Sequence, residues 1–239
     1  MKKNLHEPRV IIIYGSSQSG KSFFAQEIQK QLNEQGFDVH FTPRYYTRQK
    51  RDGAQEDENS IFNQEIDEKD FDIIVNIYGN KVGTKISEVK KMLESGTTPI
   101  FLTTERKNVT RMLNFFPNAL TFKTLMKSPL TIADYLAKEK ERNPQLSDEE
   151  NFDSAKRRFV LYKEVEQDNE GVQNLILNPF ERNSRNEEVQ QQTALLVEGV
   201  CEKIKKDTRK KSIIEIGKEK VLKMIENTKK SVTGIMGKD

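Results

Sequence analysis

The amino-acid sequence predicts an α/β fold built on a mostly parallel sheet with helices on both faces. Two observations predict it. Between residues 10 and 178, apolar runs typical of buried strands alternate with segments whose apolar residues recur at the helical period. In addition, a Gly-x-x-x-x-Gly-Lys-Ser stretch at residues 15–22 lies between the first apolar run and the first helical segment. Right-handed crossovers would place this stretch at the carboxyl ends of the parallel strands.

The first strand and the first helix flank this stretch. Residues 10–14, Val-Ile-Ile-Ile-Tyr, form the continuous apolar run expected of a strand buried on both faces. Residues 23–35 are expected to be helical, because their apolar side chains recur at the helical period. The apolar stripe consists of Phe24, Ala25, Ile28 and Leu32. Gly36 follows, at the position where a left-handed C-terminal cap favours glycine.

The alternation continues along the chain to residue 178. Further strands are expected at residues 38–42, 71–78, 99–104, 119–126 and 172–177. Further helices are expected at residues 83–94, 105–115, from Ser128-Pro129 to about 142, and from the polar segment 145–151 to about 168. Ser128-Pro129 offers an N-cap followed by proline at the first helical position.

Residues 15–22 have the sequence and the context of a phosphate-binding loop. A helix N-terminus presents free N–H groups and the positive end of the helix dipole, which together attract an anion. Lys21 can reach the β- and γ-phosphates of ATP, and the Ser22 hydroxyl can ligate Mg²⁺. The residues expected to bind the ATP phosphates are Gly15, Ser17, Ser19, Gly20, Lys21, Ser22 and Phe23. The alternative, an ordinary glycine-rich turn, is disfavoured by the strand before it and the helix after it.

Composition limits the class of protein. Of the 239 residues, 32% are charged, and no apolar run approaches the roughly 20 residues that span a bilayer. The single cysteine, Cys201, excludes an internal disulfide and suits a reducing compartment, so a cytoplasmic location is expected. Cys201 lies on an apolar helical stripe, which favours packing in the core over a reactive thiol.

Basic residues are concentrated at the C-terminal end of the chain. The net charge is +3, yet residues 202–239 hold twelve basic and six acidic side chains. Two amphipathic helices are expected here, one that includes Leu195, Cys201 and Ile204, and a more basic one near residues 213–225. Packing of this extension on the core, or on the second subunit of a homodimer, is favoured over binding to nucleic acid or to an anionic lipid surface.

Four blocks of the sequence, taken in order, resemble the guanylate kinase family of nucleoside monophosphate kinases. The resemblance covers roughly residues 9–182. The blocks are residues 15–22; Thr47-Arg48-x-x-Arg51 before Asp52-Gly53; Asn80-Lys81-Val82-Gly83-Thr84; and Arg142 with Lys156-Arg157-Arg158-Phe159 and Leu175-Ile176-Leu177-Asn178.

This resemblance implies transfer of the γ-phosphoryl group of ATP to a nucleoside monophosphate, with Mg²⁺ as cofactor. It implies a phosphate-loop domain at residues 1–183, with an acceptor lobe near 42–80 and a lid near 142–157, followed by a helical extension at 184–239. The catalytic residues that it implies are Lys21, Arg142 and Arg158, with Arg157 as the alternative to Arg158. The acceptor-binding residues that it implies are Arg48, Arg51, Thr84 and Asn178.

The acceptor region departs from the family pattern. Ile73 stands where the family places an acid that reads guanine, and Lys81 and Val82 replace two tyrosines. The strand at 99–104 lacks the family's Asp-x-Asp, with Glu105 one position beyond its expected end. Two hypotheses therefore stay open: a divergent nucleoside monophosphate kinase whose acceptor is GMP or another nucleotide, or a non-catalytic nucleotide- or protein-binding module.

Overall fold

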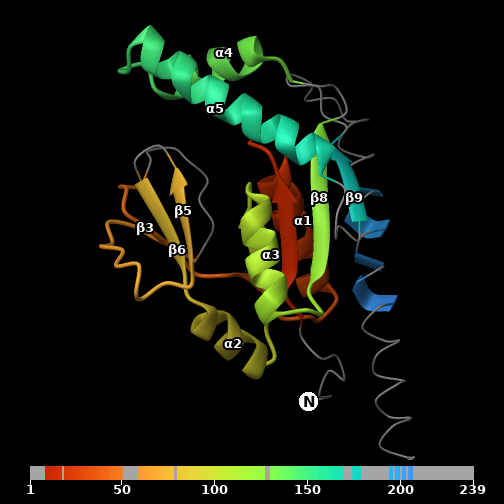
Figure 1. Ribbon diagram of the computed structural model, residues 1–239. Coiled ribbons are helices and arrows are strands. Elements are labelled where there is room, and N and C mark those ends of the chain that lie inside the picture. Colours follow the sequence, from red (N-terminus) through yellow and green to blue (C-terminus); the bar gives the residue numbers. More distant parts are fainter. Residues whose placement is uncertain are drawn as a thin grey trace, which may run out of the picture.

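The computed structural model describes residues 9–17, 19–50, 59–77, 80–126, 130–168 and 174–178, and the short segments 194–195, 197–199, 201–202 and 204–206. A five-stranded parallel sheet has the strand order β2-β7-β1-β8-β9. Its strands are β1 (Ile11–Gly15), β2 (Val39–Phe41), β7 (Thr98–Thr103), β8 (Leu120–Met126) and β9 (Asn174–Asn178). Helices pack against both faces (Figure 1), so the predicted α/β fold class is confirmed.

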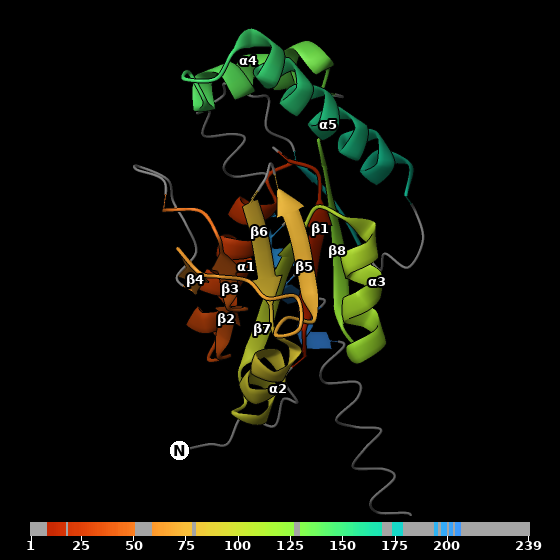
Figure 2. The same ribbon diagram turned by 60° about the vertical axis from the view of Figure 1, so that its left-hand side comes forward.

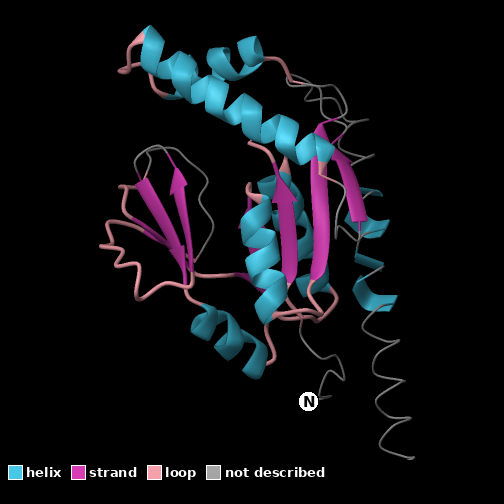
Figure 3. Cartoon of the chain, viewed as in Figure 1, coloured by secondary structure: helices cyan, strands magenta, loops and turns pink. Residues whose placement is uncertain are grey.

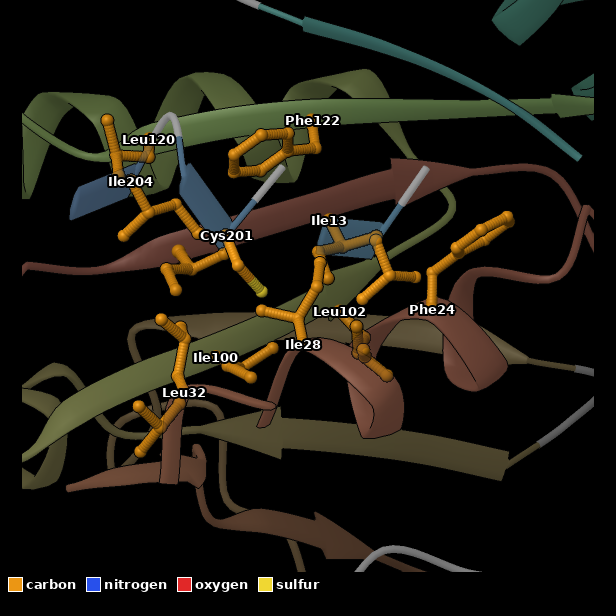
Figure 4. Packing of buried hydrophobic residues seen from close by; sticks show 14 of the residues in the cluster. Ile13, Phe24, Ile28, Leu32, Ile100, Leu102, Leu120, Phe122, Cys201 and Ile204 are labelled. Atoms are coloured by element: carbon orange, nitrogen blue, oxygen red, sulfur yellow. The ribbon is translucent and has the colours of Figure 1, made fainter. Parts of the chain in front are cut away.

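Strand β1 is apolar throughout because both of its faces are covered. Alternate residues of a strand point to opposite faces. Ile11 and Ile13 pack with α1 (Lys21–Glu34), whereas Ile12 and Tyr14 pack with α3 (Arg106–Phe115). Figure 4 shows the first of these two clusters, in which the side chains of α1 meet those of the central strands.

Part of the C-terminal extension completes the α1 side of the core. Val197, Cys201 and Ile204 are buried in the same cluster as the α1 stripe (Figure 4). Core packing of Cys201 is therefore confirmed, and burial raises the pKa of its thiol to about 11. Leu195, an apolar residue of the same predicted amphipathic helix, is 68% exposed. The second helix, predicted near residues 213–225, lies outside the described residues.

A second, four-stranded sheet has the order β4-β3-β6-β5 and stands apart from the parallel sheet (Figure 3). Its strands are β3 (Arg44–Tyr46), β4 (Ser60–Ile61), β5 (Ile73–Ile77) and β6 (Asn80–Thr84). Gly83 and Thr84 belong to β6, so the predicted helix start at residue 83 is wrong, and α2 spans Ile86–Glu94. Gly83 is required in the sheet instead, since a Cβ there would lie 2.8 Å from Cγ of Phe71.

Two antiparallel helices, α4 (Ile132–Arg142) and α5 (Asp148–Gln167), lie across the end of the parallel sheet (Figures 1 and 2). Each begins with a capping box, Thr131 with Asp134 and Ser147 with Glu150, which satisfies free N–H groups of the first turn. The helix predicted from Ser128-Pro129 thus has Thr131 as its N-cap; residues 128 and 129 lie outside the described part. Tyr135, Phe159 and Tyr162 pack between the two helices.

Candidate functional site

Gly15 closes β1 at a point where the chain has no room for a side chain. A Cβ at residue 15 would overlap the hydroxyl of Thr124 and would lie 2.6 Å from Oγ of Ser19. Ser19 Oγ in turn lies 2.7 Å from Oγ1 of Thr124 and donates to the carbonyl oxygen of Ser16, at 2.9 Å. These contacts fix the turn from β1 into α1 against the neighbouring strand β8.

The N-terminus of α1 is arranged to receive an anion. Gly20, the N-cap, has a φ of 81°, a left-handed conformation that favours glycine. No side chain caps this terminus and no acid lies in its first turn, so its N–H groups and dipole are not compensated by the helix itself. Lys21 Nζ donates to the Ser16 carbonyl at 3.0 Å, and Ser22 and Phe23 are exposed. A polyphosphate with a hydrated divalent cation fits this donor set.

Two side chains from the α4–α5 hairpin contact the loop at Ser17. The Tyr135 hydroxyl donates to the Ser17 carbonyl at 3.1 Å, and Arg158 Nη1 donates to Ser17 Oγ at 2.7 Å. Arg158 also forms an ion pair with the buried Glu139, with Nε 2.9 Å from Oε1. The hairpin thus rests directly on the predicted phosphate-binding loop.

A cavity of about 200 Å³ opens between the loop, the second sheet and α5. Its lining comes from four separate parts of the chain. The lining residues are Ser17, Asn76, Thr104, Glu105, Arg157, Arg158 and Leu161. The predicted phosphate-binding loop, two guanidinium groups and several uncharged and acidic polar groups therefore line one cavity.

Glu105 contributes the acidic group of the cavity. It directly precedes α3, and its Oε2 lies 2.9 Å from Lys107 Nζ and accepts from Asn108 Nδ2 at 3.3 Å. Its backbone N–H donates to Oγ1 of Thr103, at 3.2 Å. The carboxylate is consequently held at the carboxyl end of β7, beside the loop that follows β1.

Two of the acceptor residues implied by the resemblance, Arg48 and Thr84, do not line this cavity. Arg48 donates from Nη1 to the Gln49 carbonyl at 2.9 Å and stacks on the rings of Tyr46 and Phe62, at 4.7 and 5.0 Å. Thr84 is buried in β6, opposite Ile73, and does not line the cavity. Arg51 lies outside the described residues.

For two other predicted residues the structure gives the backbone alone. Arg142 is the last residue of α4 and Asn178 the last of β9, and the described part does not include their side chains. Strand β9 and helix α4 both end on the same side of the parallel sheet as α5 (Figure 1). Their predicted roles therefore stay predictions.

Ile73, which replaces the guanine-reading acid, is not a cavity residue. It is 1% exposed and packs in the core with α2 and α3 side chains. The β5 residue that lines the cavity is Asn76, a polar residue within an otherwise apolar strand. Lys81 is paired with Glu68, with Nζ 3.1 Å from Oε1, and Val82 is buried.

Sequence reasoning missed Asn76, Thr104 and Leu161 of the cavity lining, and also Tyr135 and Glu139, which contact the loop and Arg158, respectively. Asn76 could have been found as the interruption of an apolar run, and Thr104 as the residue that follows a buried strand. Tyr135 and Glu139 lie four residues apart, on one face of α4, and both are buried. The contact of Tyr135 with the loop and that of Glu139 with Arg158 depend on the packing of the hairpin, which no local pattern encodes.

A buried lysine of β8 binds the C-terminal end of α5. Lys123 of β8 is 2% exposed and donates to the carbonyl oxygens of Glu166, at 3.3 Å, and Asp168. Burial lowers the pKa of Lys123; burial and the neighbouring Asp168 raise the pKa of Tyr14. Because these carbonyls end α5, the lysine stabilises the negative end of the helix dipole against the central strands.

Comparisons with known proteins give a fold likeness and nothing closer. No protein-family model matches the sequence, and no curated protein matches it. Among solved structures, the chain is similar to a guanylate kinase from Anaplasma phagocytophilum, at 10% sequence identity and a TM-score of 0.47. The match covers 86% of this chain and 89% of that one. In the described part of the chain, no helix is both long and apolar enough to cross a membrane.

Proposed function

We propose that this chain is a phosphotransferase that binds ATP at residues 15–22 and moves its γ-phosphoryl group to a nucleoside monophosphate. One observation carries the proposal. One cavity is lined by Ser17 of the phosphate loop, by Arg157 and Arg158 of α5, by Asn76 of the second sheet, and by Thr104 and Glu105, which follow β7. Phosphoryl transfer requires little covalent chemistry from a protein and depends on bringing these kinds of group together.

The donor half of the proposed site rests on the geometry of the loop. The uncapped N-terminus of α1 and the Lys21 ammonium would hold the phosphates of ATP. The exposed Ser22 hydroxyl would hold Mg²⁺, which supplies charge neutralisation on the phosphates when it is bound. The Lys21 ammonium is cationic and the N-terminus of α1 is the positive end of the helix dipole, so both suit a polyanionic ligand.

The α5 arginines have different proposed roles. Arg158 already reaches the loop through Ser17, so it is the arginine proposed to stabilise the transferred group. Arg157 lines the same cavity and donates from Nε to the Asp153 carbonyl at 3.3 Å. It is proposed to contact the acceptor phosphate, because a guanidinium binds phosphate in a bidentate manner.

The proposed acceptor is a nucleoside monophosphate, GMP or another, with its base beside Asn76, Thr104 and Glu105. An amide and a hydroxyl both donate and accept hydrogen bonds, whereas a carboxylate only accepts them. A site that hydrogen-bonds its substrate discriminates strongly, by roughly 10⁴-fold or more against an analogue that leaves buried groups unpaired. We therefore expect one preferred base, read by residues other than those of the family pattern.

The test is a coupled assay of ADP release with Mg²⁺-ATP and each ribo- and deoxyribonucleoside monophosphate in turn. Stimulation by one acceptor, abolished by Lys21→Ala, is the expected result. If no acceptor stimulates ADP release, and Lys21→Ala behaves as the wild type does, the proposal is wrong.

A non-catalytic binding module is the second candidate, and the position of Arg48 favours it. Arg48 stacks on Tyr46 and Phe62, and neither it nor these rings line the cavity. The coupled assay of ADP release separates the two candidates, because a module of this kind would bind nucleotide or a protein partner without turnover. The preserved phosphate loop counts against a module that has lost nucleotide binding.

A further inference from the structure

Glu139 is a buried carboxylate between α4 and α5. Its side chain is 1% exposed, and an ionised carboxylate in such a place must be compensated by its neighbours. Oε1 lies 2.9 Å from Nε of Arg158 in an ion pair. Oε2 accepts a hydrogen bond from Ser154 Oγ at 2.6 Å and another from Asn143 Nδ2 at 3.4 Å. Oε2 fixes the carboxylate through these hydrogen bonds, whereas the Oε1–Nε contact with Arg158 is an ion pair without hydrogen-bond geometry.

Arg158 is held by two partners of unequal strength. Its Nε faces the fixed carboxylate of Glu139, whereas its Nη1 donates to the neutral hydroxyl of Ser17 at 2.7 Å. A charged phosphate oxygen is a stronger acceptor for a guanidinium than a hydroxyl is. A phosphate on the loop can therefore replace Ser17 at Nη1 while Glu139 keeps its contact at Nε.

We infer that Glu139 is a positioning residue for Arg158, which aims the guanidinium so that its terminal amino groups pass from Ser17 to the transferred phosphoryl group. This inference rests on the proposed function. Arginine has a long side chain with many rotamers, and attraction to the buried carboxylate beside Nε restricts that freedom before a ligand binds. Glu139 itself would touch neither nucleotide, since it does not line the cavity.

The first test is Glu139→Gln, which keeps the size of the side chain and an acceptor for Ser154 but removes the charge that attracts Arg158. We expect kcat to fall roughly tenfold to a hundredfold, as for other small misplacements of a reacting group, with KM for ATP changed by less than about twofold. Glu141→Gln is the matched control, because Glu141 lies in the same helix and its side chain is 67% exposed. The control is expected to match the wild type.

A double-mutant cycle separates positioning from a general loss of structure. If Glu139 acts through Arg158, Glu139→Gln causes no further loss of kcat in an Arg158→Gln background. Losses that multiply in the double variant would contradict the inference. Thermal unfolding of all variants shows whether any of them has lost the folded state.

Two further measurements keep the result decisive. If Glu139→Gln does not fold, Ser154→Ala replaces it: removal of the 2.6 Å bond leaves Oε2 with the longer bond from Asn143 and so loosens the carboxylate. An unchanged kcat in that variant would overturn the inference. Calorimetry with ADP and a non-hydrolysable ATP analogue tests the inference without turnover. If the wild type binds the analogue but phosphorylates no acceptor, the proposed function fails. The inference then still requires that Glu139→Gln lowers the preference for the analogue over ADP by about threefold or more. A smaller change in this preference would overturn the inference as well.

Discussion

The Oγ of Ser19 lies 2.7 Å from the Oγ1 of Thr124, which links the phosphate loop to β8 across 105 residues of sequence. The contact occupies the space where a side chain at residue 15 would stand. The glycine that begins the loop motif is thus required by the packing of β1 against β8.

Gly15→Ala is expected to destabilise the protein by about 1–3 kcal/mol, since the new Cβ would overlap Thr124 and lie 2.6 Å from Ser19 Oγ. Nucleotide binding should be lost with it, because the turn into α1 must shift. Thermal unfolding and calorimetry measure the two effects. Gly199→Ala is the control: no atom lies within 4 Å of its Cβ position, and alanine in a helix should stabilise by about 0.5–1 kcal/mol. Equal effects of the two substitutions would contradict the packing argument.

Lys21→Ala is expected to lower turnover by roughly 100-fold or more, because one cationic donor to the transferred phosphate is removed. Lys21→Arg should not restore it, since a guanidinium is larger than the ammonium that reaches the Ser16 carbonyl at 3.0 Å. ADP release and ATP binding are measured for both. Lys30→Ala, at an exposed position of the same helix, should leave both unchanged.

Cys201 is expected to resist alkylation at pH 8 until the protein unfolds. Burial raises the pKa of its thiol to about 11, so about one molecule in a thousand carries the thiolate at pH 8. Mass spectrometry after iodoacetamide treatment, with and without urea, counts the labelled fraction. The raised pKa also means that the stability due to the buried thiol is fully present below about pH 9 and is lost as pH rises toward about 11. Rapid labelling of the native protein would show that residue 201 is not buried in solution.

The parallel sheet and α1 are predictable from sequence because their signals are local. A buried strand, a glycine-containing turn and an amphipathic helix occur within residues 10–35. The face that a helix turns to the core is set by packing, which is why Leu195 is exposed while Val197 is buried. The same limit applies to Glu139: its position in the chain indicates a solvated helix residue, and only the docking of α4 on α5 makes it a buried partner of Arg158.

The acceptor region could not be predicted because resemblance was the only guide to it. The position that the family pattern assigns to a guanine-reading acid, Ile73, faces the core, and the cavity takes Asn76 from the same strand. A strand alternates its side chains between two faces, so residues 73 and 76 point to opposite sides of β5. We therefore assign the proposed base-reading role on this strand to Asn76.

Ile73→Glu is expected to destabilise the protein by roughly 3–5 kcal/mol and to create no preference for GMP, because a carboxylate at this 1% exposed position would lie unpaired in the core. Asn76→Asp should fold normally, since Asn76 is exposed, and should change which nucleoside monophosphate is preferred by placing an acceptor-only group at the cavity. Thermal unfolding and the acceptor panel measure both outcomes. Ile74→Glu controls for a new charge on β5, because Ile74 is half-buried on the opposite face from Ile73. A stable Ile73→Glu variant with new GMP turnover would mean that residue 73 faces the acceptor after all, and the assignment of Asn76 would be wrong.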